Sequence, residues 1–303
     1  SIMITASHNP GNENGFKLSF EDFASGSKIQ EFANYLNSLN FKTGNGIITN
    51  KDIKALYVET LLKDIKINKC LKLVLDLGNG ATGIIAKDVF SKINVDVTYL
   101  FDTVDGTFPN HHPDPSIKDN MITLINKVKE INADLGFAID GDGDRIGIVD
   151  NLGNFYHADT LGVLYAKDVL KNSSNKKIVG DIKCTGALKE VTESMGGEYF
   201  SYRPGASFMM PYVRDNDMAL GIEYSGHMYF NDHFMPITSA IYSALRLLEI
   251  LSNEDKSLNT LINEIPKYFK SDEIKIPTTD LLKFNIVEKV SEYARNKGLK
   301  VTS

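Results

Sequence analysis

The feature that most constrains the fold is a pattern that occurs twice along the chain. An apolar strand, a glycine-containing turn and a helix-like stretch follow one another over residues 72–90 and again over residues 177–195. Each copy is followed by a further apolar strand that ends in an acidic residue, over 134–140 and 217–223. Buried apolar strands that alternate with helices build mixed or parallel sheets covered by helices. The sequence therefore predicts a series of α/β units.

Three helices are predicted from caps and apolar spacing. Ser116 and Asp119 resemble a capping box ahead of an apolar helix face. Asp159 is placed to cap a helix over 161–170, and apolar residues at helical spacing cover 237–251. The 303 residues suffice for about two domains, or three small ones.

Composition and charge exclude several classes of protein. Lys and Arg number 33 against 39 Asp and Glu, a formal net charge of −6, which argues against a nucleic-acid-binding protein. No apolar run reaches the roughly 18 residues of a membrane span. Two cysteines, Cys70 and Cys184, cannot form a disulfide framework. We therefore expect a cytoplasmic protein without nucleic-acid or membrane partners.

The strongest local motif is an acidic loop between two apolar strands. Asp140, Asp142 and Asp144 alternate with glycines and are followed by Arg145. Carboxylates at this density suit a hard cation such as Mg²⁺. An EF-hand does not fit, because its sixth position would be Arg145 instead of Gly and its twelfth would be Asn151 instead of Glu. The remaining alternative is an acidic hairpin turn that holds no ion.

A second polar motif runs from Thr5 to Pro10 and is followed by residues 14–17. Ser7 beside His8 could be an activated nucleophile. An adjacent histidine is often poorly oriented as a base, so a plain polar loop remains the alternative for this segment taken alone.

A third motif covers residues 221–227, at the end of a predicted strand. Glu223 and Ser225 together could hydrogen-bond two adjacent sugar hydroxyls, and His227 could transfer a proton. An ordinary polar turn is the alternative. The segment 105–115 carries three prolines and two adjacent histidines, and we interpret it as a structural loop between domains instead of a metal site.

In this order, the segments resemble the α-D-phosphohexomutase superfamily, most closely its phosphomannomutase/phosphoglucomutase members. Residues 5–10 resemble the phosphoserine loop, 105–115 a loop of the second domain, and 140–145 the metal loop. Residues 223–227 resemble the sugar-recognition loop, and 241–251 resemble the helix that follows it. The resemblance implies an α/β fold of successive mixed α/β domains around a central cleft.

The resemblance also implies four domains. Residues 1–52 would be the C-terminal part of the phosphoserine domain, 53–154 the metal-binding domain, and 155–267 the sugar-recognition domain. Residues 268–303 would begin a C-terminal phosphate-binding domain. Because the first and last domains would be incomplete, we expect a chain truncated at both ends that is inactive when it is alone.

Roles for single residues follow from the same resemblance. Ser7 would carry the transferable phosphoryl group. A phosphate oxygen on Ser7 and three aspartates would hold Mg²⁺: Asp140, Asp142 and Asp144. Three cationic groups would surround the reacting phosphate: His8, Lys17 and Arg145. Lys17 or His227 would transfer a proton. The substrate would be bound by four residues: Lys183, Glu223, Ser225 and His227.

The implied enzyme is an isomerase that interconverts hexose 1-phosphate and 6-phosphate, of mannose or glucose, with glucose or mannose 1,6-bisphosphate as activator and intermediate. It would be a monomer, with a dimer as the alternative. Two other functions stay open, phosphoglucosamine mutase and a catalytically silent sugar-phosphate-binding relative. Tyr224 argues against the first and the intact Ser7 against the second.

Two positions depart from the family pattern. Ala206 stands where many relatives have a substrate-contacting histidine, which puts the preferred sugar in doubt. Ile222 stands where relatives usually have glycine, and we expect it to shift the backbone of the sugar loop.

Overall fold

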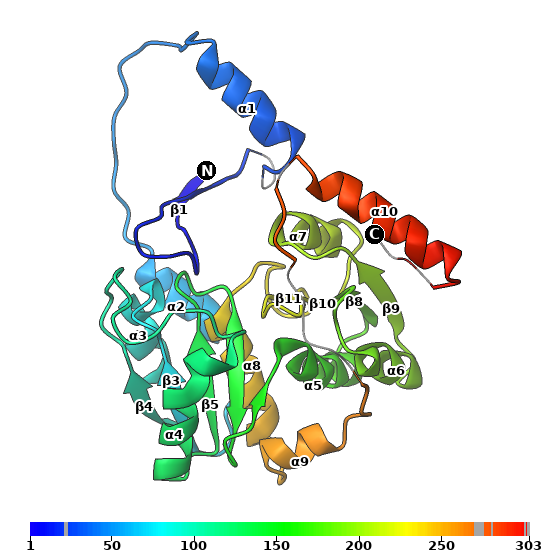
Figure 1. The fold of residues 1–303 in the computed structure, drawn as a ribbon. Helices are drawn as coiled ribbons and strands as arrows, with labels where there is room; N and C mark the ends of the chain where they lie inside the picture. Colours follow the sequence, from blue (N-terminus) through cyan, green and yellow to red (C-terminus); the bar gives the residue numbers. More distant parts are fainter. Residues whose placement is uncertain (21–23, 270–275, 280, 300, 302–303) are drawn as a thin grey trace. The chain divides into compact units, whose positions relative to one another are not determined.

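A computed structural model describes residues 1–20, 24–269, 276–279, 281–299 and 301. These residues form two compact units, Ser1–Pro266 and Lys267–Ser303. The larger unit contains three sheets and the helices that cover them (Figure 1). The predicted α/β class is therefore confirmed.

The first large sheet has the strand order β4-β3-β5-β6-β7. Its strands are β3 (Leu71–Asp76), β4 (Val95–Leu100), β5 (Leu135–Ile139), β6 (Ile146–Asp150) and β7 (Phe155–Tyr156). β3 pairs in parallel with β4 and β5, whereas β6 returns antiparallel beside β5. The acidic loop connects β5 to β6, so it lies at the C-terminal edge of a buried strand.

Helices α2 (Lys54–Leu62), α3 (Ala86–Phe90) and α4 (Ile122–Ile131) accompany this sheet, with 3-10 turns at Ala81–Ile84 and Lys118–Met121. The predicted capping box is wrong: α4 begins at Ile122 without a side-chain cap. The Ser116 hydroxyl donates to Asp114 instead, at 2.6 Å.

The second large sheet has the strand order β11-β10-β8-β9. Its strands are β8 (Lys177–Asp181), β9 (Glu198–Tyr202), β10 (Leu220–Ile222) and β11 (Met228–Phe230). β8, β9 and β10 run parallel, and β11 is antiparallel to β10. The third polar motif therefore forms the tight connection between β10 and β11.

Five helices belong to this sheet or follow it: α5 (Ala158–Asn172), α6 (Gly186–Ser194), α7 (Ala206–Asp215), α8 (Ala240–Ser252) and α9 (Leu258–Asn263). The predicted cap of α5 is wrong, because Asp159 lies inside the first turn and His157 precedes the helix. Asp159 accepts the backbone N–H of Thr185 at 2.9 Å and so ties α5 to the start of α6. The helix predicted over 237–251 is confirmed as α8, which Ser239 caps.

The two large sheets share one hydrophobic core. A single cluster of buried side chains contains Leu75 and Phe137 from the first sheet, Ile178 and Ile222 from the second, and Leu245 from α8. Figure 1 shows α8 between the two sheets, and α8 packs against β5, β6 and α5. Helix α8 therefore packs in the core shared by the two sheets, one of which carries the loop after β5 and the other the loop after β10.

The N-terminal segment is a hairpin of β1 (Ile2–Ile4) and β2 (Phe16–Leu18), followed by α1 (Ser27–Asn37). The two strands are antiparallel, with Ile4 opposite Phe16 and Met3 opposite Lys17. Because side chains alternate between faces of a strand, Lys17 lies on the opposite face from Ile4 and Phe16.

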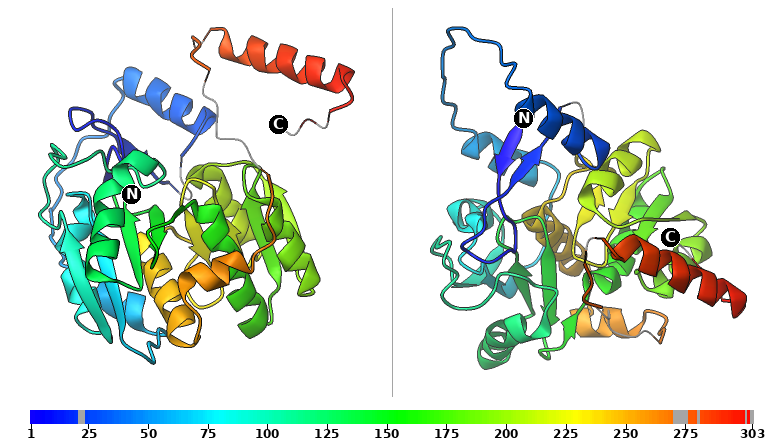
Figure 2. Two further views of the ribbon diagram at one scale, coloured as in Figure 1. Left: turned by 60° about the horizontal axis from the view of Figure 1, so that its bottom comes forward. Right: turned by 45° about the horizontal axis from the view of Figure 1, so that its top comes forward.

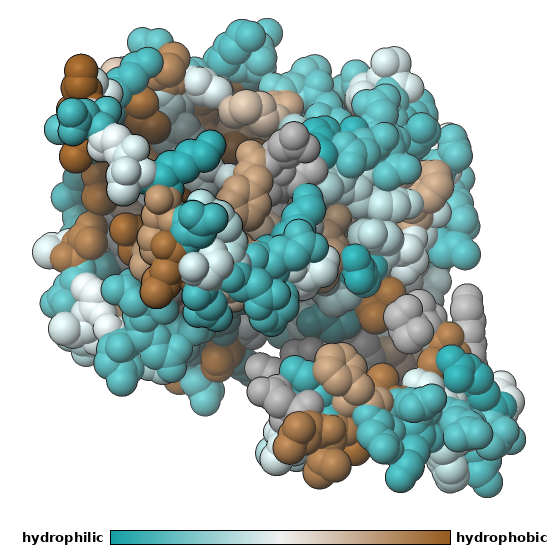
Figure 3. Space-filling view, turned by 90° about the horizontal axis from the view of Figure 1, so that it is seen from above, coloured by the Kyte–Doolittle hydropathy of each residue, from teal (hydrophilic) through white to brown (hydrophobic). Residues whose placement is uncertain are grey.

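The apolar face of this hairpin is open to water. Ile2, Ile4 and Phe16 are 66%, 68% and 66% exposed, and no residue of α1 is buried. Figure 2 shows the extended segment that links α1 to α2, and Figure 3 shows apolar side chains on this part of the surface.

The smaller unit contains α10 (Lys283–Asn296), none of whose residues is buried. The apolar residues of the segment 299–303 predict the start of a strand from the sequence. Residues 300 and 302–303 lie outside the described part, and residues 299 and 301 are in no strand. Among the described helices, none has the length and apolarity that a bilayer-spanning segment needs.

Candidate active site

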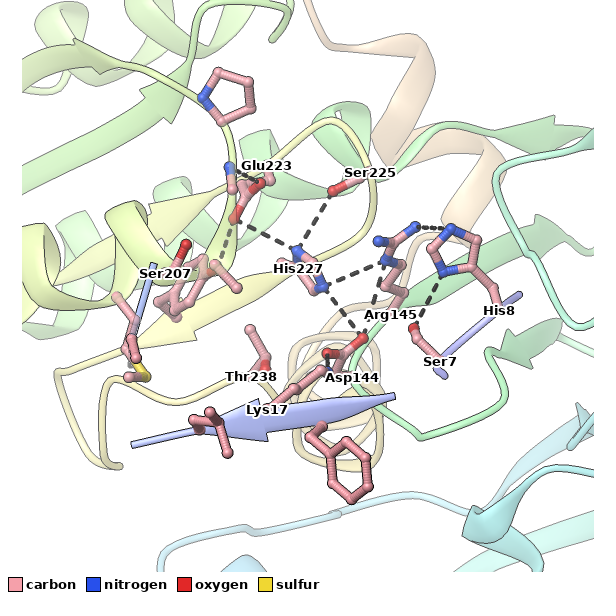
Figure 4. Close-up of a pocket in the computed structure, with 18 residues that line it drawn as sticks. Ser7, His8, Lys17, Asp144, Arg145, Ser207, Glu223, Ser225, His227 and Thr238 are labelled. Carbon is pink, nitrogen blue, oxygen red and sulfur yellow. Dashed lines mark hydrogen bonds and ion pairs between the residues drawn. The ribbon is translucent and has the colours of Figure 1, made fainter. Parts of the chain in front are cut away.

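The structure brings the first three polar motifs to one cavity of about 600 Å³ (Figure 4). The hairpin contributes Ser7, His8 and Lys17, and the loop after β5 contributes Asp144 and Arg145. Much of the remaining lining comes from the connection between β10 and β11 and from the start of α7: Pro204, Gly205, Ala206, Ser207, Glu223, Ser225 and His227.

Ser7 has an unusual backbone. Its φ is 55°, in the left-handed region that residues other than glycine seldom adopt. A Cβ added at Gly141 would lie 2.3 Å from the Ser7 carbonyl oxygen. Glycine at position 141 therefore lets the serine loop approach the acidic loop closely.

The Ser7 hydroxyl lies between the acidic loop and His8. Its Oγ is 3.2 Å from Asp140 Oδ2, 3.1 Å from Asp142 Oδ1 and 3.1 Å from His8 Nδ1. Arg145 Nη1 lies 3.4 Å from His8 Nε2, and because arginine can only donate, Nε2 is the acceptor. The proton of His8 is then on Nδ1, which donates to Ser7, while the single proton of the Ser7 hydroxyl is donated to Asp140 or to Asp142.

The protonation of His8 agrees with this geometry. Burial, and then the neighbouring charge of Arg145, lowers the pKa of His8 below its usual value. A neutral His8 that donates to Ser7 positions the hydroxyl but does not remove its proton.

The three aspartates form a compact cluster that fits a hard cation. Each of Asp140, Asp142 and Asp144 offers one carboxylate oxygen, and these oxygens lie within 4.8 Å of one another. Oδ1 of Asp140 accepts three backbone N–H groups of its own loop, at 2.9 to 3.1 Å. Its Oδ2 therefore faces the cluster. Burial, and then the charges of Asp144 and Asp142, raises the pKa of Asp140. A bound cation would relieve the repulsion between these carboxylates.

Lys17 supplies the nearest positive charge. Its Nζ lies 2.8 Å from Asp142 Oδ2 and 2.9 Å from Asp144 Oδ2. Thr5 also donates to Asp142 Oδ2, at 2.9 Å. Burial lowers the pKa of Lys17, but the charge of Asp144 and the hydrogen bonds to both aspartates outweigh burial and raise it.

His227 connects the acidic loop to the sugar loop. Its Nε2 is 3.1 Å from Asp144 Oδ1, and its Nδ1 is 3.4 Å from Glu223 Oε1. Burial lowers the pKa of His227, but the hydrogen bonds and charges of Asp144 and Glu223 outweigh burial and raise it to about 9. Arg145 Nε also lies 3.3 Å from Nε2, a contact that needs the neutral ring. Nε2 of His227 therefore donates to Asp144 when the ring is protonated and accepts from Arg145 Nε when the ring is neutral.

Glu223 is held from three sides. Its side chain is 2% exposed, Oε2 accepts the N–H of Gly205 at 2.8 Å, and Oε1 accepts the Tyr229 hydroxyl at 2.5 Å. Ser225 Oγ lies 3.5 Å from His227 Nδ1. Glu223 therefore fixes the start of α7 relative to the sugar loop. Glu223 and Ser225 both line the cavity.

Three other positions need separate mention. Lys183 is not found among the described residues that line the cavity; its Nζ lies 5.5 Å from the centre of the Tyr224 ring. Ala206 lines the cavity at the first position of α7 and offers a methyl group there. Ile222 is buried, and a Cβ added at Gly162 of α5 would lie 2.7 Å from its side chain, so Ile222 packs on α5.

The loop 105–115 supports the site from behind. His111 Nε2 lies 3.1 Å and 3.2 Å from the two oxygens of buried Asp76, and Nδ1 donates to the His112 carbonyl at 2.9 Å. Pro113 contacts the positions of Gly78 and Gly141 where a Cβ would stand. The segment 105–115 therefore supports the acidic loop by packing Pro113 against Gly141.

Sequence reasoning missed Thr5 as a site residue and Tyr229 altogether. Tyr229 is fully buried, lines the cavity and binds Glu223. Alternation along a strand places residues 227 and 229 on one face, and this signal could have found it. Nothing in the local sequence marks the contact of Thr5 with Asp142, which is 137 residues away.

Comparison with known proteins agrees with this arrangement. Residues 55–153 match the family model of phosphoglucomutase/phosphomannomutase α/β/α domain II, and residues 157–269 match domain III. A phosphomannomutase/phosphoglucomutase of Pseudomonas syringae is 39% identical, over 100% of this chain and 65% of that protein. A phosphomannomutase of Methanocaldococcus jannaschii is 32% identical, over 97% of this chain and 67% of that protein. The chain thus spans about two thirds of these relatives.

Solved structures show the same fold. A phosphoglucomutase/phosphomannomutase family protein of Burkholderia thailandensis has a TM-score of 0.84 and 37% identity, covering 88% of this chain and 58% of that one. An N-acetylphosphoglucosamine mutase of Aspergillus fumigatus, solved with GlcNAc-6P and magnesium, has a TM-score of 0.52 at 15% identity, covering 70% and 52%.

The two matched domains and the serine–aspartate–sugar-loop cavity define a protein of the phosphoglucomutase/phosphomannomutase class. The chain belongs to the α-D-phosphohexomutase superfamily.

Proposed function

We propose that the protein is a phosphohexomutase that interconverts the 1-phosphate and 6-phosphate of mannose or glucose. One observation carries this proposal: Ser7 Oγ lies within 3.2 Å of two aspartates of a cation-binding cluster, at the edge of the cavity that Glu223 and His227 also line. The names of the relatives that are 39% and 32% identical support it.

The reaction begins from Ser7 that carries a phosphoryl group. The free hydroxyl oxygen of a hexose phosphate forms a bond to phosphorus, and the bond from phosphorus to Ser7 Oγ breaks. The hydroxyl proton passes to a base on the protein, and Ser7 Oγ gains a proton as it leaves. Lys17 and His227 are the candidates for the base, and each acts as a base in its neutral form, which its raised pKa makes the minor form near pH 7. The product is a hexose 1,6-bisphosphate, which turns over in the cavity and returns its other phosphate to Ser7.

The protein's own groups stabilise the charge of the transferring phosphoryl group. Arg145 and His8 lie on one side of Ser7 Oγ and can donate to phosphate oxygens. Asp140, Asp142 and Asp144 would hold Mg²⁺, which supplies positive charge beside the reacting oxygens when it is bound. The Aspergillus structure with magnesium supports this choice of cation.

Recognition of the sugar is assigned to Glu223 and Ser225, whose oxygens can bind the 3- and 4-hydroxyls. These hydroxyls are shared by both orientations of the bisphosphate, so one pair of residues can serve both steps. Glu223 already accepts from Gly205 and Tyr229, so it has limited capacity left for the sugar. Lys183, which stands over Tyr224, would reach the substrate only after its side chain moves.

The alternatives receive less support. The N-acetylglucosamine-phosphate mutases among the structural neighbours are 14% to 17% identical, against 39% for the Pseudomonas syringae relative. A structure of one of them with glucose 1,6-bisphosphate supports a bisphosphate intermediate in this fold. The cytoplasmic location and the monomeric state remain predictions.

The function is tested with the protein expressed from its complete coding sequence. Glucose 1-phosphate is converted in the presence of glucose 1,6-bisphosphate, and glucose 6-phosphate is detected by its dehydrogenase. We expect Ser7→Ala to abolish turnover and to remove a phosphate that mass spectrometry places on Ser7. Ser38→Ala, at the exposed end of α1, is the matched control. Full activity of Ser7→Ala would refute the mechanism.

A further inference from the structure

We propose that Lys17 is a built-in counter-ion that occupies the acidic cluster until a divalent cation binds, and that cation binding then delivers its ammonium group to the sugar cavity. This inference rests on the metal site of the proposed function. It concerns Lys17 and not the cluster itself.

Two aspartates of the cluster already have a positively charged partner in Lys17. Asp144 has both oxygens engaged, Oδ1 by His227 at 3.1 Å and Oδ2 by Lys17 at 2.9 Å. Lys17 also takes Oδ2 of Asp142, at 2.8 Å. A divalent cation bound by Asp142 and Asp144 lies a few ångströms from the Lys17 ammonium group, so the two positive charges repel each other and compete for these carboxylates.

Lys17 is the partner that can leave. The His227 side chain is 7% exposed and is fixed between Asp144 and Glu223. The Lys17 side chain is 34% exposed, and it belongs to a three-residue strand of a two-stranded hairpin. A flexible four-carbon side chain at an open edge changes rotamer at much lower cost than a buried imidazole with two partners.

The released ammonium group has a defined destination. Lys17 lines the same cavity as Ser7 and His227 (Figure 4). Repulsion by a divalent cation a few ångströms away moves the ammonium group off Asp142 and Asp144 and toward that cavity. The cation thereby frees the Lys17 ammonium group to donate to a phosphate oxygen of the substrate, whereas in the protein without a cation this group is bound to Asp142 and Asp144.

The test measures cation binding without any sugar. Isothermal titration with MgCl₂ or MnCl₂ is run on the wild-type protein, on Lys17→Met, and on Lys17→Gln as a second variant in case the first does not fold. Lys127→Met is the control, because it removes the same charge from a surface pair with Glu130. We expect about tenfold tighter cation binding in both Lys17 variants and no change in Lys127→Met.

Thermal unfolding separates a counter-ion from a merely structural lysine. In EDTA the Lys17 variants should unfold at a lower temperature than the wild type, because Asp142 and Asp144 lose the ammonium group that both bind. At saturating Mg²⁺ the difference should disappear. An equal loss in both conditions would show that Lys17 only supports the hairpin and would overturn the inference.

The failure of the inference is distinct from the failure of the metal site. If the wild-type protein binds neither Mg²⁺ nor Mn²⁺, the metal part of the proposed function is wrong. If it binds them and the Lys17 variants bind with the same affinity, within twofold, the metal site stands and Lys17 does not compete for it.

Discussion

The contact between Gly141 and Ser7 allows a sharp test of how closely the serine loop must be placed. The substitution Gly141→Ala adds one methyl group, which would lie 2.3 Å from the Ser7 carbonyl oxygen. Real Cβ atoms essentially never approach closer than 3.0 Å, so the serine loop must move by at least 0.7 Å (3.0 − 2.3). Gly141 has no positive φ, so the added methyl group causes no backbone strain of its own.

The expected cost is in turnover. A displacement of about 1 Å in a reacting group can cost roughly 100-fold in rate, so a shift of this size should lower kcat by about 30-fold. The assay is the coupled conversion of glucose 1-phosphate in the protein from the complete coding sequence. The rate at which glucose 1,6-bisphosphate phosphorylates Ser7, followed by intact mass, should fall in parallel.

The matched control is Gly106→Ala, where an added Cβ meets no atom within 4 Å. We expect it to retain the wild-type rate. If Gly141→Ala also keeps kcat within threefold, the close approach of the two loops does not position Ser7, and our account of the serine loop is wrong.

Further predictions concern stability, pH and metal. Arg246→Met should lower the free energy of unfolding by about 3–5 kcal/mol, because Arg246 is 3% exposed and its loss leaves buried Asp232 without its positively charged partner. The control Lys127→Met should change the free energy of unfolding negligibly. Equal effects of the two substitutions in denaturant titrations would refute this prediction. Burial lowers the pKa of His111, but its bond to Asp76 and the charge of Asp76 outweigh burial and raise it above 6.5. The stability from this pair is thus complete below about pH 6.5 and lost as pH rises through the folded-state pKa. The stability advantage over His111→Gln should therefore shrink as pH rises above about 6.5, and a constant difference would contradict this prediction. Asp142→Asn should weaken Mg²⁺ binding and turnover, and unchanged affinity by titration would show that the acidic loop is only a turn.

Much of the fold could be predicted, because it follows from periodicity. The apolar runs ahead of Gly78 and Lys183 are β3 and β8 in the structure, and the strand before Asp140 is β5. A buried strand shows in the sequence as an apolar run because its side chains face the core. This pattern does not depend on which particular residues those side chains contact. The helix over 237–251 was predictable for the same reason.

Helix starts were harder to predict. Ser116 and Asp159 both have the side chains of N-caps, yet each finds a different partner, Asp114 for Ser116 and the N–H of Thr185 for Asp159. A capping pattern is local, and any nearby acceptor or donor competes with the helix end. Only the folded structure decides between the competitors.

Sequence reasoning predicted most of the polar residues that line the candidate site, but not Tyr229 and not the contacts between them. Resemblance to a family brought Ser7, the acidic loop and the sugar loop into one proposal, and the structure places them on one cavity. The contacts that set their behaviour run between distant segments, such as Thr5 on Asp142 and Lys17 on Asp144. No pattern within a segment encodes a partner more than 100 residues away.

One further consequence concerns how a sugar could turn over in the cavity. The acidic loop and the sugar loop are bonded to each other through the Ile146 N–H and the Gly226 carbonyl at 3.3 Å, and the Gly143 carbonyl accepts the N–H of Ala240 at the start of α8. Asp144 and His227 add a third link. The acidic loop and the sugar loop therefore cannot separate without breaking these links. In the proposed mechanism, the bisphosphate would reverse its orientation against a surface whose two loops are fixed to each other, so the freedom for that rotation would come from other parts of the cavity lining.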